Sequence, residues 1–304
     1  MRTILELANT TTGTSNIDSL TPEVWSAQAE QQGENLRVAR NFIKVDRSLV
    51  GKPGDVAHIL KGARLVQSVD VETNKTEASD ATFYALDDYG SLDLTPAPYY
   101  SAVQVTEDTV EEVNIDVLAD ATTYIAEALA QYEDVQILST GQSNAGNSVF
   151  GGDATSNATL DTGDILTTDL FANAIREIRK DRYQPDVCFL APDQENVFLK
   201  DSQFVNAAQY GSNKVVANGE LGEYLGVKII VTNNVATVSP NTGTAHACVM
   251  WDSKKSLVLA LKHDIRIKSD YYVPSGNYRI VGRLKFAVGV LFSDAICKIA
   301  VTDT

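Results

Sequence analysis

Two stretches of alternating apolar and polar residues, ARLVQSVDVE and ATFYALDDY, flank a polar tip between Thr73 and Asp80. Alternation with a period of two residues indicates strands, so residues 61 to 98 are predicted to form a long hairpin. An isolated two-stranded ribbon is marginally stable in water, because it buries too little apolar surface by itself. The hairpin is therefore expected to project from a larger body and to lie against another surface.

A long helix is predicted from Asn114 to Leu138, with a length of about 35 Å at the standard rise per residue. Its apolar residues recur at spacings of three and four, which is the pattern of a helix with one buried face. These residues are Val113, Val117, Leu118, Ala121, Ile125, Ala128, Leu129 and Tyr132. The polar, glycine-rich segment STGQSNAGNSVFGGDATSN follows, and we interpret it as a connector between two subdomains.

The remaining chain mixes helices and strands. A second helix is predicted from Thr168, with Arg179, Lys180 and Arg182 near its C-terminal end, where cations are favourable. DVCFLAP is typical of a buried strand, and DQENVFLKD of a short helix with Asp193 as its N-cap. Further strands are predicted at VKIIVT, HACVMWD, DIRIKSDYY, YRIVGRLKFAVGVLF and DAICKIAV. This order indicates an α+β fold without internal repeats.

The glycine-rich segment GELGEYLGVKIIVTNNV raises the question of a phosphate-binding loop. Such a loop follows a strand and opens a helix, because the anion sits at the helix N-terminus. Here Gly219, Gly222 and Gly226 precede the predicted strand Val227 to Thr232, and no Gly-Lys-Ser/Thr sequence follows. We therefore interpret the segment as a helical turn with a glycine C-cap that leads into a buried strand.

Composition excludes several classes of protein. The net charge of −15 argues against a general nucleic-acid-binding protein, which normally carries a basic excess. Cys188, Cys248 and Cys297 are far apart and form no CxxC pair, so we expect buried thiols in a reducing cytoplasm. The N-terminus does not resemble a secretory signal, and no apolar stretch reaches the roughly 18 residues of a membrane span. We expect a soluble protein.

The search for catalytic and ligand-binding motifs is negative. His246 and Cys248 share one face of a predicted strand, but no further metal ligand follows at motif spacing. The segment GQSNAG at 141 to 146 lacks the second glycine of a nucleophile elbow and follows a helix, where the elbow requires a strand. Asp87 and Asp88 lack the ligand spacing of a calcium loop. We predict no catalytic residue, no cofactor-binding residue, no metal ligand and no enzyme activity.

Charge is distributed unevenly along the chain. Residues 51 to 112 contain twelve acidic and four basic residues, a net charge of −8, whereas residues 253 to 285 contain eight basic and two acidic residues, a net charge of +6. Both segments can be ordinary solvated surfaces. Alternatively, the acidic hairpin lies across the basic C-terminal strands of an identical neighbour. The candidate intersubunit residues are Glu72, Glu77, Asp80, Arg266, Lys268, Arg279 and Arg283.

The order of these elements resembles that of the major capsid proteins of tailed double-stranded DNA viruses. The resemblance covers nearly the whole chain and rests on TPEVWSAQ, GDVAHILKG, NIDVLADATTYIAEALAQ, DVCFLAPDQENVFLKD and GELGEYLGVKIIVTNNV. It implies the α+β tailed-phage capsid fold. In that fold residues 1–45 would be the N-terminal arm, 60–98 the E-loop, and 146–262 the axial (A) domain. Residues 46–59, 99–145 and 263–304 would form the peripheral (P) domain, with the long helix as its spine.

The resemblance also implies a structural function. The chain would assemble into pentamers and hexamers of an icosahedral shell, in the virion of a bacteriophage or archaeal virus, built in the host cytoplasm. Its partners would be other copies of itself, separate scaffolding, portal and decoration proteins, and packaged double-stranded DNA through weak non-specific contact, with no membrane. Two alternatives stay open: a shell subunit of an encapsulin nanocompartment, and an acidic surface or binding module.

Overall fold

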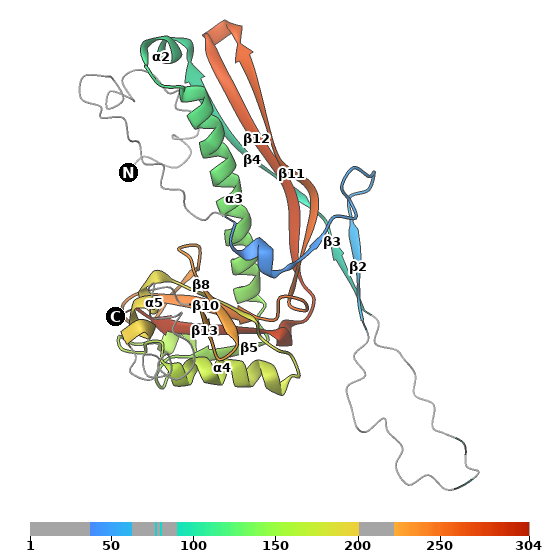
Figure 1. Ribbon diagram of the computed structural model, residues 1–304, viewed down its shortest axis with the longest axis vertical. Coiled ribbons are helices and arrows are strands. Elements are labelled where there is room, and N and C mark those ends of the chain that lie inside the picture. Colours follow the sequence, from blue (N-terminus) through green and yellow to red (C-terminus); the bar gives the residue numbers. More distant parts are fainter. Residues whose placement is uncertain (1–36, 63–76, 78–79, 81–89, 201–221, 304) are drawn as a thin grey trace.

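The computed structural model describes residues 37–62, 77, 80, 90–200 and 222–303. A long helix, α3 (Val117–Ser143), runs along a four-stranded sheet and reaches down to a second, seven-stranded sheet flanked by helices (Figure 1). A third, two-stranded sheet projects sideways from the first. Among the described residues, no helix is long and apolar enough to cross a membrane.

The four-stranded sheet has the order β1 (Lys44–Asp46), β11 (Leu257–Tyr272), β12 (Asn277–Val290) and β4 (Ala97–Thr106). Strands β11 and β12 form a long antiparallel ribbon whose tip is a 3-10 turn, Val273–Ser275. Helix α3 covers one face of this ribbon, with Ile125 and Leu129 fully buried against it and Leu118 packed at the edge of the same core. The predicted buried stripe is confirmed at Ala121, Ile125 and Leu129, whereas Tyr132 is exposed and Val113 precedes the helix.

Helix α3 begins and ends later than the sequence suggests. A separate short helix, α2 (Glu107–Glu112), precedes it, and Asp116 is the N-cap, accepting a hydrogen bond from the Ala119 amide at 3.0 Å. The helix continues through Gly141, where the sequence analysis predicted a connector. A Cβ atom at Gly141 would lie 3.1 Å from the Trp251 ring, so the glycine lets the helix pack closely on the second sheet. This contact outweighs the low helix propensity of glycine.

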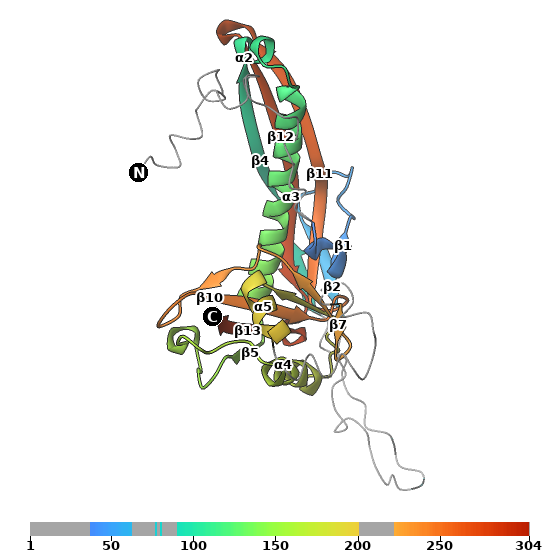
Figure 2. The same ribbon diagram turned by 60° about the vertical axis from the view of Figure 1, so that its left-hand side comes forward.

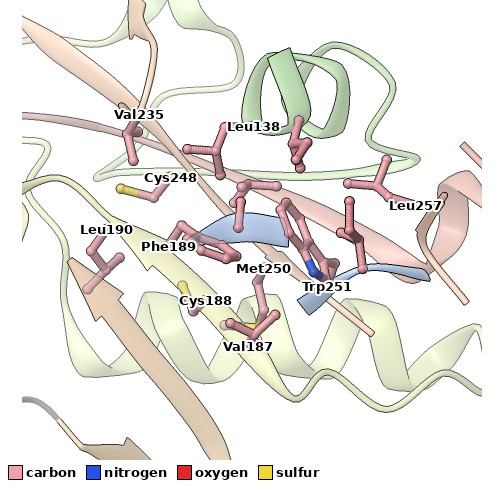
Figure 3. Close-up of a cluster of buried hydrophobic side chains, with 14 of the residues drawn as sticks. Leu138, Val187, Cys188, Phe189, Leu190, Val235, Cys248, Met250, Trp251 and Leu257 are labelled. Carbon is pink, nitrogen blue, oxygen red and sulfur yellow. The ribbon is translucent and has the colours of Figure 1, made fainter. Parts of the chain in front are cut away.

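The seven-stranded sheet has the path β5 (Asn147–Phe150), β13 (Ile296–Thr302), β10 (Ala245–Trp251), β6 (Val187–Leu190), β8 (Val227–Val231) and β7 (Glu223–Tyr224). Strand β9 (Thr237–Val238) also pairs with β10. Helix α4 (Thr168–Lys180) lies against β5 and β13, and α5 (Pro192–Lys200) follows β6 (Figure 2). Leu138 of α3, Phe189 and Trp251 belong to one buried cluster, shown in Figure 3.

Three local expectations are corrected. Residues 223–226 form the β7–β8 hairpin, not a helical turn, because Leu225 and Gly226 both have positive φ, 53° and 82°, as a type I′ turn requires. Helix α5 begins at Pro192, so Asp193 lies in its first turn and is not the N-cap. Strand β13 joins β10 in the seven-stranded sheet, although residues 263–304 were expected to belong together to the peripheral domain.

The base of the predicted hairpin is present. Strands β2 (Ala57–Lys61) and β3 (Gly90–Leu94) pair antiparallel, with Lys61 opposite Gly90. Of the rest of the predicted hairpin, the structure describes residues 62, 77, 80 and 95–98; Glu77 and Asp80 are both exposed, and Ala97 already begins β4. The segment TPEVWSAQ and the pair Asp87 and Asp88, which the sequence analysis considered as cation ligands, also lie outside the described part of the chain.

Candidate assembly surfaces

The base of the hairpin is fixed to the β11–β12 ribbon by a small apolar core. Strand β3 crosses β12 at Gly289, where a Cβ atom would come within 2.6 Å of Leu94 and 3.0 Å of Leu92. The absence of a side chain at this glycine is what allows the close crossing. The buried members of this core are Leu49, Ala57, Ile59, Leu94, Val258, Ala260 and Leu291. The hairpin is thus held at its base by its own subunit.

The four candidate basic residues lie on one face of the β11–β12 ribbon. Arg266 and Lys268 belong to β11, Arg279 and Arg283 to β12, and all four are exposed. Residues that alternate with them, such as Ile280 and Leu284, are buried on the opposite face. The basic face is therefore the side of the ribbon turned away from α3.

Like charges meet directly on this basic face. Arg266 and Arg283 occupy opposite positions of the ribbon, next to a β-bulge between His263 and Arg266. Directly opposed like charges destabilise a strand pair, and bulges re-aim neighbouring side chains. Burial and then the charges of Arg266, Arg283, Lys262 and Lys285 lower the pKa of His263, as expected at a positive surface.

A shallow cavity of about 250 Å³ opens at this opposed pair of arginines. Tyr100 of β4 forms one wall, and the Arg283 guanidinium lies 5.4 Å from the centre of its ring. The other lining residues are His263, Arg266, Lys268 and Val281. Within the described residues, none of the four candidate basic residues forms an ion pair with a carboxylate. The cavity thus offers guanidinium groups beside an aromatic ring, a combination suited to a carboxylate-bearing ligand.

The acidic half of the predicted charge pairing is described only in part. Glu77 and Asp80 are exposed, and Glu72 lies outside the described residues. The structure therefore brings the four basic residues together on one face, and it does not bring Glu77 or Asp80 into an ion pair with them.

A buried charged cluster that the sequence analysis missed anchors residues 37–42 to α3. Glu133 and Asp134 are both almost fully buried in the helix. Glu133 lies 3.3 Å from Arg37 and 3.5 Å from Arg40, and the two arginines also reach Asp264 of β11, each at 3.2 Å. A signal was present in the sequence, because Glu133 continues the buried stripe Ile125, Leu129, Ile137 at a spacing of four.

Asp134 binds the backbone of the same anchored segment. Its carboxylate accepts hydrogen bonds from the Val38 amide at 2.6 Å and from the Ala39 amide at 3.2 Å. Burial raises the pKa of Asp134 to about 6, although these two hydrogen bonds favour the ionised form. Burial likewise raises the pKa of Glu133, against the attraction of Arg40 and Arg37. The contact between residues 37–42 and α3 therefore depends on the ionisation of two buried carboxyl groups.

The sequence profile of one family, described as phage capsid protein, matches residues 89–299. This match spans more than half of the chain and includes α3, both long ribbon strands and most of the seven-stranded sheet. The chain belongs to the phage capsid protein family. No curated protein matches the sequence.

Solved structures agree with this family on the fold. The capsid protein superposes on a chain of Mycobacterium phage Che8 with a TM-score of 0.66 at 20% identity, covering 91% of this chain and 96% of that chain. The capsid of Ralstonia phage GP4 gives a TM-score of 0.68 at 13% identity, with coverages of 93% and 95%. The capsid asymmetric unit of cyanophage Pam1 gives 0.67 at 12% identity, with coverages of 92% and 96%. The α+β tailed-phage capsid fold is therefore confirmed.

The family is structural, in agreement with the expectation that this capsid protein is not an enzyme. The sequence GQSNAG lies at the end of α3, so its Ser143 is not on a strand-to-helix turn. Cys188, Cys248 and Cys297 are buried free thiols, as predicted. One group of described residues has metal-ligand atoms close together, namely Asp193, His246 and Asp303.

Proposed function

We propose that this capsid protein assembles into the pentamers and hexamers of an icosahedral shell that encloses a double-stranded DNA genome. The match of the family profile over residues 89–299 carries the proposal, because it identifies a viral shell component. The close coverage of the Pam1 capsid asymmetric unit supports it, since an asymmetric unit of that capsid is a part of a symmetric shell. Shell subunits of this kind act by contact, without catalysis.

The proposed division of the chain into domains follows the two large sheets. We assign residues 1–45 to an N-terminal arm, 60–98 to an E-loop, and 146–262 to an A domain that faces the capsomer axis. We assign to the P domain residues 46–59, 99–145 and 263 onward, with the exception of β13. Strand β13 is assigned to the A domain because it pairs with β10. The long ribbon and α3 give the P domain a stiff shape that many contacts along a shell require.

The intersubunit contact that we propose joins the hairpin of one copy to the basic face of another. Arg266, Lys268, Arg279 and Arg283 are exposed without a carboxylate partner among the described residues, and the hairpin carries Glu72, Glu77 and Asp80. A single exposed ion pair contributes less than about 1 kcal/mol. The contact is repeated by every subunit, so small contributions accumulate over a closed shell and fix the register of neighbours.

Further partners are also part of the proposal. Scaffolding, portal and decoration proteins would bind the assembled shell, and packaged DNA would touch it weakly. The net charge of −15 argues against strong DNA binding by the subunit alone.

Electron microscopy of the expressed protein tests the proposed function. We expect closed icosahedral particles with five- and six-subunit capsomers. Particles from infected cells should contain DNA. Particles that enclose a cargo enzyme and no genome would indicate an encapsulin, and a monomer under all assembly conditions would indicate a binding module. Either of these results would contradict the proposal.

A further inference from the structure

Three ligand-bearing side chains converge on the seven-stranded sheet, away from the basic face. Asp193 lies in the first turn of α5, His246 on β10, and Asp303 directly after β13. One ligand atom from each residue lies within 4.8 Å of the others. Two ligands of one metal ion, each about 2.1 Å from it, are at most about 4.2 Å apart. A small movement of the exposed Asp193 side chain would bring the ligand atoms, now within 4.8 Å of one another, to this limit.

A hydrogen bond holds His246 and Asp303 next to each other. Their Nδ1 and Oδ1 atoms are 2.8 Å apart, and their side chains are only 17% and 14% exposed. The Asp303 carboxylate also accepts hydrogen bonds from the side chains of Gln194 and Thr244.

Gln194 supplies an independent observation at the same place. The residue is 1% exposed, and its Nε2 donates a hydrogen bond to Asp303 Oδ1 at 2.6 Å. Its Oε1 is buried and has no hydrogen-bond partner among the described residues. Because both amide atoms are bonded to one carbon, Oε1 lies about 2.2 Å from Nε2, the atom that contacts Asp303. A buried polar atom without a partner costs about 1–3 kcal/mol, and an ion beside it is one explanation.

We propose that Asp193, His246 and Asp303 bind one divalent transition-metal ion, with the oxygen of Gln194 as a further ligand. One imidazole nitrogen and several oxygens suit Zn²⁺ or Mn²⁺ better than Ca²⁺, which prefers oxygen ligands alone. This site revises the sequence-based expectation of no metal, which considered His246 only together with Cys248. Cys248 is fully buried, and its sulfur is not among the clustered ligand atoms.

A bound ion would connect the start of α5, strand β10 and the C-terminal end of the described chain. These three segments are far apart in sequence, and the ion would tie them as a crosslink within the subunit. The site is independent of the proposed contact between hairpin and basic face, and a shell could assemble whether or not the site exists.

The test uses the full chain, stripped with a chelator and titrated with Zn²⁺ by calorimetry. We expect one ion per chain, and a higher Tm when zinc is present. Asp193→Ala changes an exposed side chain and leaves the His246–Asp303 pair intact, and His246→Gln removes the imidazole. Each variant should weaken zinc binding at least about tenfold and abolish the rise in Tm.

The matched control is His58→Gln. His58 and Asp93 form a second histidine–aspartate pair, with Nδ1 and Oδ1 2.7 Å apart, on the exposed β2–β3 base. Zinc binding should be unchanged in this control. The proposal is overturned by the absence of stoichiometric zinc, by full binding in either site variant, or by loss of binding in the control. With Co²⁺ as a probe, a thiolate charge-transfer band would show Cys248 as a ligand and would also overturn it.

Discussion

Gly282 of β12 lies directly beneath Ile125 of α3, with no space for a side chain between them. A Cβ atom at position 282 would clash with the Ile125 side chain and would lie 2.9 Å from Leu129. The spine helix and the sheet therefore approach each other more closely than they could with alanine at this position.

We expect Gly282→Ala to lower the free energy of unfolding by about 1–3 kcal/mol, because it overpacks this contact. Ile125→Ala should lower it by about 2–5 kcal/mol through the cavity that it leaves. Gly62→Ala is the matched control, since a Cβ atom there meets nothing within 4 Å. Denaturant unfolding of the subunit measures all three. A neutral Ile125→Ala variant would mean that the helix does not pack on the sheet as described.

The anchor of residues 37–42 predicts an unusual pH dependence. Because the folded-state pKa of Asp134 is about 6, above its ordinary 3.8, the folded protein binds this proton more tightly than the unfolded chain. Its ionisation therefore reduces stability as the pH rises from about 4 to about 6, by roughly 3 kcal/mol in total. Asp134→Asn should remove this contribution while keeping a carbonyl oxygen for the Val38 amide.

Urea unfolding of the wild type and of Asp134→Asn between pH 4 and pH 7 measures the effect. The stability of the variant relative to the wild type should rise across this range. Parallel curves would show that Asp134 titrates normally. Asp264 and Asp303, whose pKa values are lowered, act in the opposite direction, but only at pH values below that window.

The basic face predicts a separation between folding and assembly. Arg266→Glu with Arg283→Glu changes exposed residues and replaces one opposed pair of like charges by another, so the free energy of unfolding of the subunit should stay within about 0.5 kcal/mol of the wild type. Shell formation should weaken, because the proposed partner is acidic. Lys44→Glu with Lys254→Glu alters the net charge equally at exposed positions outside the basic face.

Light scattering during assembly, at several salt concentrations, compares these two double variants. The salt dependence of assembly should decrease only in the variant of the basic face. Reversal of Glu72, Glu77 and Asp80 to lysine should restore its assembly. If assembly of the two double variants depended equally on salt, the basic face would be an ordinary solvated surface.

The sequence was sufficient for elements whose signal is local. The periodicity around Ile125 predicted the buried face of α3, and the apolar run Val187–Leu190 predicted a buried strand. The features that the sequence analysis missed depend on contacts between residues that are far apart in the sequence. Gly141 stays helical because of Trp251, and Glu133 is tolerated in the core because Arg37 and Arg40 approach it from a segment almost a hundred residues earlier. Only the strand register shows that Arg266 faces Arg283.

The central claim is that subunits join through the hairpin of one copy and the basic face of another. Trypsin cleavage after Lys75, in the polar tip between Thr73 and Asp80, measures this contact most directly. The rate is followed by mass spectrometry in unassembled subunits and in closed shells. We predict rapid cleavage in the subunit and at least about tenfold slower cleavage in the shell. Cleavage at the same rate in both states would contradict the docking of the hairpin on a neighbouring subunit.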